Sequence, residues 1–136
     1  MGRTSRRATR FDITVLGTFS GAHRLRLPNG EWEPLHGHNW KVEVVIAAQR
    51  LDRWDMAVDF LDVQKWLRET LAKLEHRYLN EMPEFRRRNP SAERIAMFIA
   101  EQVARSLKRS GCRVVQASVW ETDETCATYY PEQTRR

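Results

Sequence analysis

The sequence contains no long apolar segment and few cysteines. None of its apolar runs approaches the ~18–20 residues that a membrane helix requires, so a membrane location is not expected. Its basic N-terminus is followed by a polar β-strand pattern, which excludes the apolar segment of a secretory signal. The two cysteines, Cys112 and Cys126, are too few for a disulfide framework. We therefore expect a cytoplasmic protein with free thiols.

Acidic residues are absent from the first ten positions, which carry four arginines, Arg3, Arg6, Arg7 and Arg10. The formal net charge of the chain is +5, so these four charges leave only +1 for residues 11–136. Nucleic-acid binding proteins usually carry a basic patch on the folded body. We expect residues 1–10 to form a flexible basic tail and residues 11–136 to form a single domain. Nucleic acid is not the expected partner.

Two segments near the N-terminus have the pattern of β-strands. Residues 11–20 are rich in β-branched and aromatic side chains, and the expected strand continues toward Leu25. Residues 38–48 alternate between apolar and polar side chains, which is typical of a half-buried strand. Only a loop with the turn signal Pro28-Asn29-Gly30 separates the two segments, so we expect them to pair antiparallel.

The spacing of apolar residues then changes to that of helices, over residues 60–74 and again over 95–107, after a helix start at Asn89-Pro90-Ser91. Residues 114–120 and 125–130 predict two further strands joined by a tight turn. This ββααββ order predicts an α+β fold, in which a four-stranded antiparallel sheet carries two helices on one face. The free edges of such a sheet favour a homo-oligomer.

Three of the four histidines are expected to come together. His36 and His38 lie two residues apart on a strand, so their side chains leave the same face, and Gly37 adds no bulk between them. His23 lies at the end of the preceding strand, which antiparallel pairing brings next to the start of the second. Three neutral imidazoles with a fourth position open are typical of catalytic zinc, although nickel or iron fits the same ligands. A merely polar strand face is the alternative interpretation.

Six short motifs run through the chain in order: Phe-Ser-Gly-Ala-His-Arg-Leu at 19–25, Leu-His-Gly-His-Asn-Trp at 35–40, Val-Asp-Phe at 58–60, Leu-Glu-His-Arg-Tyr-Leu-Asn at 74–80, Asn-Pro-Ser-Ala-Glu at 89–93 and Trp-Glu-Thr at 120–122. Together they resemble the 6-pyruvoyltetrahydropterin synthase / 6-carboxytetrahydropterin synthase family over nearly the whole chain outside the tail. The resemblance implies the tunnelling fold, in which three ββααββ units close their sheets into a barrel and two trimers stack into a hexamer. It also implies a substrate of the class 7,8-dihydroneopterin triphosphate.

The resemblance assigns roles to individual residues. His23, His36 and His38 match the zinc ligands of the family, and Glu121, followed by Thr122, matches the glutamate that anchors the pterin ring. A carboxylate suits that role because it accepts two parallel hydrogen bonds from the guanidine-like edge of a pterin. The alternative for Glu121 is a surface glutamate on an alternating strand.

Trp32 stands where the pyruvoyl and carboxy enzymes of the family have a catalytic cysteine, and neither cysteine of this chain is its sequence equivalent. Glu33, three residues before His36, instead resembles the Glu-x-x-His-Gly-His variant of the family. That variant is linked to folate synthesis and releases 6-hydroxymethyl-7,8-dihydropterin. A carboxylate beside zinc can act as a base if burial raises its pKa. Glu31 is a rival for this role, and a solvated loop acid is the alternative.

A second departure concerns the acid–base pair, and the phosphate-binding residues are a separate question. Glu75-His76 stands where the family usually has Asp-His as an acid–base relay, and the extra methylene of Glu75 changes the geometry of such a relay. A histidine that is simply favoured by a helix C-terminus is the alternative. A triphosphate requires cationic groups, for which the candidates are Arg24, Arg26 and the run Arg86-Arg87-Arg88. A solvated, charged loop is the alternative for that run.

The sequence therefore favours a zinc-dependent carbon–oxygen/carbon–carbon lyase that cleaves the side chain of 7,8-dihydroneopterin triphosphate to leave 6-hydroxymethyl-7,8-dihydropterin. Glu33 would act as the base, and His76, steered by Glu75, would return a proton. One alternative is a 6-carboxytetrahydropterin synthase of queuosine biosynthesis or a 6-pyruvoyltetrahydropterin synthase. Another is a non-catalytic pterin-binding protein. In each case the expected partners are a small pterin and further copies of the chain, in a trimer or hexamer.

Overall fold

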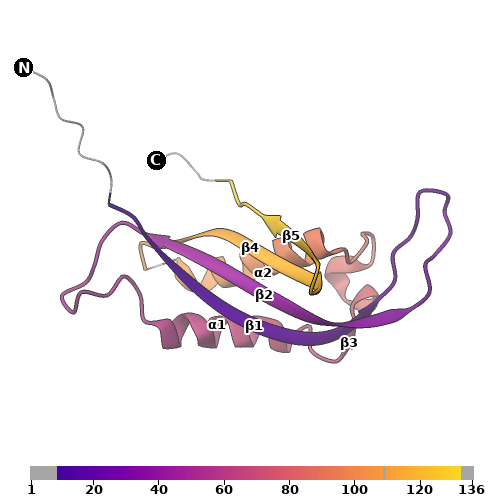
Figure 1. Cartoon of the computed structure of the whole chain (residues 1–136), viewed down its shortest axis with the longest axis horizontal. Helices are drawn as coiled ribbons and strands as arrows, with labels where there is room; N and C mark the ends of the chain where they lie inside the picture. The colour runs from indigo at the N-terminus through magenta and orange to yellow at the C-terminus, as the bar shows by residue number, and fades with distance from the viewer. Residues whose placement is uncertain (1–8, 109, 133–136) are drawn as a thin grey trace, which may run out of the picture.

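Five strands form one sheet in the computed structural model, which describes residues 9–108 and 110–132. Residues 1–8 of the expected basic tail lie outside the described residues. The strands follow one another in space as β3-β1-β2-β4-β5 (Figure 1). Their bounds are β1 Phe11–His23, β2 His36–Ala48, β3 Arg77–Tyr78, β4 Arg113–Thr122 and β5 Thr125–Tyr129.

The strand pairing confirms most of the expected sheet. β1 and β2 pair antiparallel over their whole length, from Phe11 opposite Ala48 to His23 opposite His36. β4 pairs antiparallel with both β2 and β5. The expectation of four strands was wrong, because the two-residue β3 pairs parallel with β1 at the sheet edge. A strand this short has no alternation that the sequence could reveal.

Two α-helices, α1 (Phe60–Ala72) and α2 (Ala92–Leu107), pack on the sheet as the apolar spacing predicts (Figure 1). Asp59 caps α1, because its side chain accepts a hydrogen bond from the backbone of Leu61. Ser91 caps α2 in the same way. Two short 3₁₀-helices, η1 (Leu79–Glu81) and η2 (Pro83–Phe85), lie in the connection between the α-helices.

The alternation of β1 and β2 determines which side chains face the helices. Phe19 and Trp40 are buried in the core, with parallel rings whose centroids are 5.6 Å apart. At Gly17 an added Cβ would lie only 2.6 Å from Leu71 of α1, so the helix packs directly on this strand. The same alternation carries His23 and His36 to the helix side of the sheet, at the end of the two strands.

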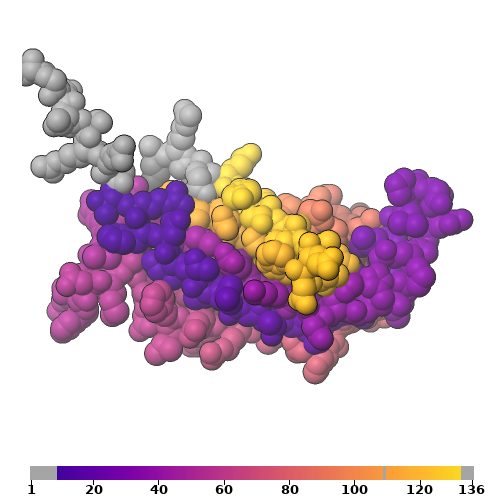
Figure 2. Space-filling model, viewed as in Figure 1, coloured from indigo at the N-terminus to yellow at the C-terminus, as the bar shows by residue number. Residues whose placement is uncertain are grey.

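The connection between β1 and β2, residues 24–35, projects from one end of the sheet (Figures 1 and 2). We call this connection the arm. Its two sides meet at an isolated bridge between Arg26 and Trp32, and its tip turns at Gly30, whose φ of 86° suits a residue without a side chain. Among the described residues, no helix has the length and apolar character needed to cross a membrane.

Candidate metal centre

Three imidazoles meet where β1 ends and β2 begins. The centroids of the His23, His36 and His38 rings lie 4.7 to 5.4 Å apart. The strand register explains this grouping, because His23 lies directly opposite His36, and His38 lies opposite Gly21, which has no side chain in the way. His23 is fully buried, whereas His36 and His38 are partly exposed. The sequence-based expectation that the three side chains come together is thus met.

Backbone carbonyls fix the protonation of two rings. Nδ1 of His23 lies 2.8 Å from the carbonyl oxygen of Pro90, and Nδ1 of His36 lies 2.8 Å from that of Pro34. A carbonyl only accepts hydrogen bonds, so each Nδ1 carries the proton and each neutral ring presents a lone pair at Nε2. The two Nε2 atoms face one another at 3.0 Å. Such an arrangement is repulsive unless a proton or a cation lies between them.

Glu121 completes the group. Its Oε1 lies 2.8 Å from Nε2 of His38, 3.5 Å from Nε2 of His23 and 3.9 Å from Nε2 of His36. Apart from this contact with Glu121, the buried Nε2 of His38 has no polar partner at hydrogen-bond distance among the described residues. Burial lowers the pKa of His38 from 6.5, and the carboxylate of Glu121 opposes that effect.

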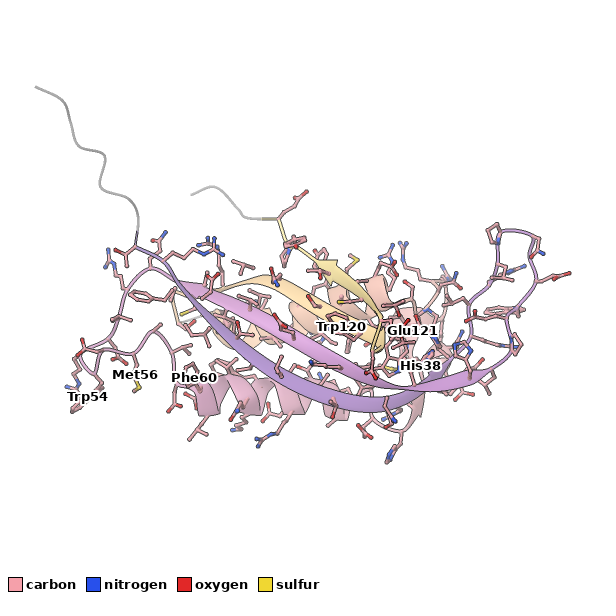
Figure 3. The ribbon with its side chains drawn as sticks, in the orientation of Figure 1. His38, Trp54, Met56, Phe60, Trp120 and Glu121 are labelled. Carbon is pink, nitrogen blue, oxygen red and sulfur yellow. The ribbon has the colours of Figure 1, made fainter. Side chains whose placement is uncertain are left out.

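The alternation of β4 carries Glu121 to the face of the imidazoles. Val119 is fully buried opposite Val42, so Glu121, two residues later, lies on the same face of the sheet as His38. The pairing of β4 with β5 shifts register between Trp120 and Thr122, which makes Glu121 an extra residue with respect to β5 only. Figure 3 shows Glu121 and His38 together at one end of the sheet, far from Trp54, Met56 and Phe60 at the other.

The donor set fits a divalent metal ion. Three imidazole nitrogens and one carboxylate oxygen all lie within 4.8 Å of one another. Zinc–nitrogen bonds of ~2.0–2.1 Å would place two ligands of a tetrahedral ion roughly 3.3 Å apart, close to the separation of the His23 and His36 nitrogens. Metal-bound histidines usually donate their other ring nitrogen to a backbone carbonyl or carboxylate, as His23 and His36 do.

Glu33, rather than its rival Glu31, reaches this group. Oε1 of Glu33 lies 3.8 Å from Nε2 of His36 and accepts a hydrogen bond of 2.9 Å from the backbone of Leu25. The backbone of Glu33 also donates to the carbonyl of Leu25, so both ends of the residue are held by the other side of the arm. Glu31 is exposed near the tip of the arm, where its backbone bonds to Leu27 and Asn29.

Glu75 and His76 form a pair that is not bonded to the three imidazoles. Oε1 of Glu75 is 3.0 Å from Nε2 of His76, and the His76 side chain is 81% exposed. His76 lines a shallow hollow that Ser20, Asn39 and His38 also line. No hydrogen bond or ion pair among the described residues joins Glu75 or His76 to the imidazoles. His76 also has a φ of 53°, a strained conformation that is common at functional sites.

A family model described as 6-pyruvoyl tetrahydropterin synthase matches residues 12–132. The chain belongs to this family. The resemblance that the motifs carry is thereby confirmed, and so is the tunnelling fold of the single chain.

A Pyrococcus furiosus protein named dihydroneopterin monophosphate aldolase is 33% identical over 112 residues, covering 82% of this chain and 90% of that protein. A 6-carboxy-5,6,7,8-tetrahydropterin synthase of Aquifex aeolicus is 26% identical, covering 72% of this chain and 75% of that protein. A solved structure of Plasmodium vivax 6-pyruvoyltetrahydropterin synthase, with a catalytic glutamate changed to alanine, is 18% identical. It has a TM-score of 0.75 and covers 92% of this chain and 99% of that chain, which shows a shared fold.

Thr122 and the two cysteines, which the sequence analysis considered, lie outside the candidate metal-binding group of His23, His36, His38 and Glu121. The hydroxyl of Thr122 bonds to that of Thr125 within the β4–β5 turn. The sulfur of Cys112 contacts the carbonyl of Ala57, and the sulfur of Cys126 lies near Thr128 on β5. No bond of either thiol therefore reaches the three imidazoles or Glu121.

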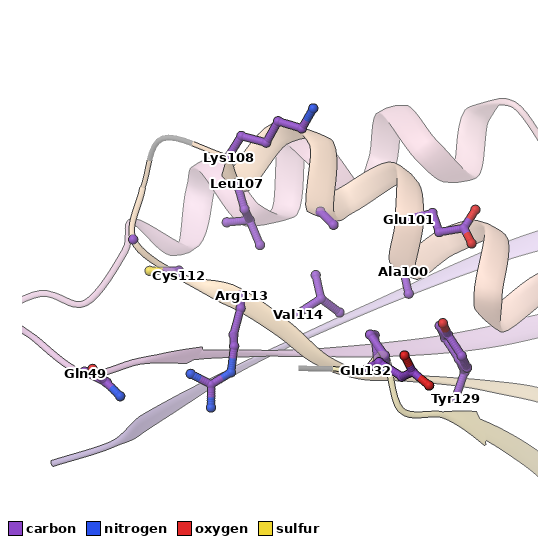
Figure 4. A pocket seen from close by; sticks show the side chains of 13 residues that line it. Gln49, Ala100, Glu101, Leu107, Lys108, Cys112, Arg113, Val114, Tyr129 and Glu132 are labelled. Atoms are coloured by element: carbon purple, nitrogen blue, oxygen red, sulfur yellow. The ribbon is translucent and has the colours of Figure 1, made fainter. Parts of the chain in front are cut away.

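A separate hollow of about 580 Å³ opens at the far end of the sheet (Figure 4). Its charged lining is balanced, with Glu101 and Glu132 against Lys108 and Arg113. None of the residues that the sequence singled out as a site residue lines it. The candidate chemistry is therefore concentrated at the arm end of the sheet.

Sequence reasoning missed two features of the candidate metal-binding group. Glu121 was expected only to contact the pterin, although its place two residues after the apolar Val119 on β4 was a signal that it shares the face of the imidazoles. The carbonyls of Pro34 and Pro90 that orient His36 and His23 were not expected either. Every residue has a backbone carbonyl, so the sequence does not reveal which carbonyls will accept from a histidine.

Proposed function

We propose that the chain is a zinc-dependent lyase that cleaves the side chain of a phosphorylated 7,8-dihydroneopterin and releases 6-hydroxymethyl-7,8-dihydropterin. The observation that carries this proposal is the carboxylate of Glu33, held 3.8 Å from His36 at the edge of the three imidazoles. A base at this position supports proton removal from a substrate oxygen next to the metal. The name of the Pyrococcus furiosus relative, an aldolase, supports carbon–carbon cleavage.

His23, His36 and His38 would hold the ion through Nε2. A bound zinc ion would polarise the side-chain hydroxyl groups of the substrate and lower their pKa. With three imidazoles as ligands, the carboxylate of Glu121 remains available to accept two hydrogen bonds from the pterin edge. Thr122 is the neighbouring candidate for a pterin contact.

The proton movements balance as a retro-aldol cleavage. Glu33 accepts the proton of the second side-chain hydroxyl, that oxygen forms a carbonyl, and the bond between the first and second side-chain carbons breaks. The electron pair passes into the conjugated pterin ring, and a proton delivered to the first carbon leaves a hydroxymethyl group. The second product is glycolaldehyde with its phosphate groups still attached. The reaction needs no oxidant, reductant or co-substrate.

His76, held by Glu75, is our candidate for the proton donor. No hydrogen bond or ion pair joins this exposed pair to the imidazoles of its own chain, so it would act at the metal-binding group of a second copy. The exposed apolar side chains of Trp54, Met56 and Phe60 support contact between copies. If Glu33→Gln and His76→Ala each inactivate the enzyme, coexpression of both variants in one oligomer should restore part of the activity. No recovery would place the two residues in the same site or remove His76 from the reaction.

Product analysis tests the function directly. Zinc-loaded protein is incubated with 7,8-dihydroneopterin triphosphate, and separately with the monophosphate, and the pterins are identified by mass spectrometry. Hydroxymethyl-dihydropterin is the expected product with at least one of the two substrates. A carboxy- or pyruvoyl-pterin would contradict the proposal and require a replacement for the missing cysteine. Bound substrate without turnover would indicate a pterin-binding protein.

A further inference from the structure

A hollow of about 760 Å³ lies between the arm and the connection that contains η1 and η2. We call it the arginine hollow, because five of its lining residues are arginines: Arg24, Arg26, Arg86, Arg87 and Arg88. The arm contributes the first two together with Trp32, and the connection contributes the other three together with Tyr78.

The charges of the arginine hollow are not neutralised by the protein. Glu81 is the one acidic residue in its lining, and no ion pair within residues 9–108 and 110–132 involves any of the five arginines. Arg10, by contrast, forms an ion pair of 2.7 Å with its neighbour Asp12. Five guanidinium groups around one hollow repel one another, so an anion that binds among them relieves that repulsion.

Two of the guanidinium groups are held in place before any ligand binds. The guanidinium of Arg24 lies over the Trp32 ring at 4.6 Å, and that of Arg26 lies 5.9 Å from the same ring. Nε of Arg24 donates to the hydroxyl of Tyr78 at 2.9 Å. Its two terminal amino groups have no hydrogen-bond partner among the described residues, and they suit the oxygens of a phosphate.

Two asparagines hold the backbone that carries these arginines. The side chain of Asn80 accepts from the backbone N–H of Arg24 and donates to its carbonyl, at 3.0 and 2.8 Å. Asn89 makes the same pair of bonds with Arg26, at 2.8 and 3.0 Å. Each asparagine amide thus bonds to both the N–H and the carbonyl of one arm residue, as a paired β-strand would. The arm is therefore fixed to the connection, and the position of the two guanidinium groups with it.

The arginine hollow adjoins the candidate base. Trp32, which lines the hollow, directly precedes Glu33, and the Glu33 carboxylate bonds to Leu25 between the two arm arginines. A substrate that reacts next to Glu33 can thus extend its charged end into the arginine hollow.

We propose that the arginine hollow binds the phosphate end of the substrate, with Trp32 as the platform that orders Arg24 and Arg26. The identity of the rest of that ligand rests on the proposed function. Trp32 takes the position of the family's catalytic cysteine, so the same substitution that removes a thiol supplies a surface for arginine stacking. The ligand class is a mono- or oligophosphate ester. Inorganic triphosphate is a suitable probe because it contains the phosphate groups that the arginines would bind.

Isothermal titration calorimetry of inorganic triphosphate into the metal-free, EDTA-treated full chain tests this proposal without turnover. The double variant Arg24→Gln/Arg26→Gln is expected to lower the affinity at least about tenfold, since charge-assisted hydrogen bonds are lost. Arg24→Lys/Arg26→Lys keeps the charge but not the planar fork, and should lie in between. The matched control is Arg68→Gln/Arg105→Gln, which removes two exposed arginines from α1 and α2. It should bind triphosphate within about twofold of the wild type.

Several results would overturn the proposal: no triphosphate binding by the wild type, an unchanged affinity in the hollow variant, or an equal loss in the control, which would indicate attraction to net charge alone. If the first double variant fails to fold, Arg87→Gln/Arg88→Gln changes two exposed side chains of the same hollow and should also weaken binding. Triphosphate binding without turnover leaves the hollow supported and the proposed function contradicted. Turnover by the wild type, together with unaltered triphosphate binding by the hollow variant, would support the proposed function and contradict the role of the hollow.

Discussion

Nε2 of His23 and Nε2 of His36 lie 3.0 Å apart, and each ring donates its other nitrogen to a proline carbonyl. Two lone pairs therefore point into the same small space, with His38 and Glu121 beside them. This arrangement is repulsive unless a proton or a cation lies between the two nitrogens, and a divalent metal ion would fill that place. The pairing of β1 with β2 builds the site, so we expect metal binding to be coupled to folding.

Zinc should accordingly stabilise the folded protein. At a free concentration about 100 times its dissociation constant, a ligand that binds only the folded state contributes about 2.7 kcal/mol. We expect one zinc per chain by elemental analysis, and a melting temperature that rises with zinc and falls with EDTA. His36→Ala should abolish both effects, whereas the control His76→Ala should retain them. A zinc response that survives in His36→Ala would contradict this ligand assignment.

The stability of the metal-free protein should depend on pH through His38. Burial lowers the pKa of His38 from 6.5 in the folded state, so the unfolded chain binds this proton more readily. The contribution of the neutral ring is therefore fully present above the unfolded pKa and decreases as the pH falls below it. Urea midpoints measured in EDTA at about pH 7.5 and about pH 5.5 should differ more for the wild type than for His38→Asn. Equal differences would remove His38 as the cause.

Gly17 allows a close approach of Leu71 of α1 to β1. A Cβ there would lie 2.6 Å from the end of the Leu71 side chain, which must shift, so Gly17→Ala is expected to cost about 1 kcal/mol of unfolding free energy. Gly37→Ala is the matched control, because its Cβ would meet only the carbonyl oxygen of Gly21, at 3.6 Å. Urea denaturation compares the two variants. Similar losses would show that the close approach of Leu71 is not the cause.

The chain should form a homo-oligomer in solution. β3 and β5 are free sheet edges in the single chain, and Trp54, Met56 and Phe60 are exposed. Light scattering should give a mass of about 48 or 97 kDa, three or six times the 16.1 kDa of one chain. A mass of one chain at working concentrations would contradict the role proposed for His76.

Much of the fold could be predicted because the strands and helices carry clear periodicity. The alternation in β2 and the three-and-four spacing in α1 and α2 gave the right elements, and the pairing of β1 with β2 followed from the short arm. His23, His36 and His38 could be placed together for the same reason, since register alone determines their faces.

The rest depended on contacts between distant segments. β3 lies beside β1, where the backbone N–H of His76 donates to the carbonyl of Ser20. A strand of two residues has no sequence pattern from which it could be predicted. Glu121 reaches the imidazoles because β4 pairs with β2 in a register that sets Trp120 opposite Lys41, and β4 alone does not reveal that register. The arginine hollow likewise requires Asn80 and Asn89 to bond to the arm more than fifty residues earlier in the chain. Tertiary hydrogen bonds of this kind leave no local pattern.

The most direct test of the central claim compares product formation by wild type and Glu33→Gln, with zinc content measured on the same samples. Gln keeps the shape of Glu33 but cannot accept the proton, so turnover should fall ~10²–10⁴-fold. Zinc content should stay the same, because the three imidazoles are untouched, and Glu31→Gln should remain active as the control. Undiminished turnover in zinc-loaded Glu33→Gln would contradict the account, because the carboxylate beside His36 would then not be the base.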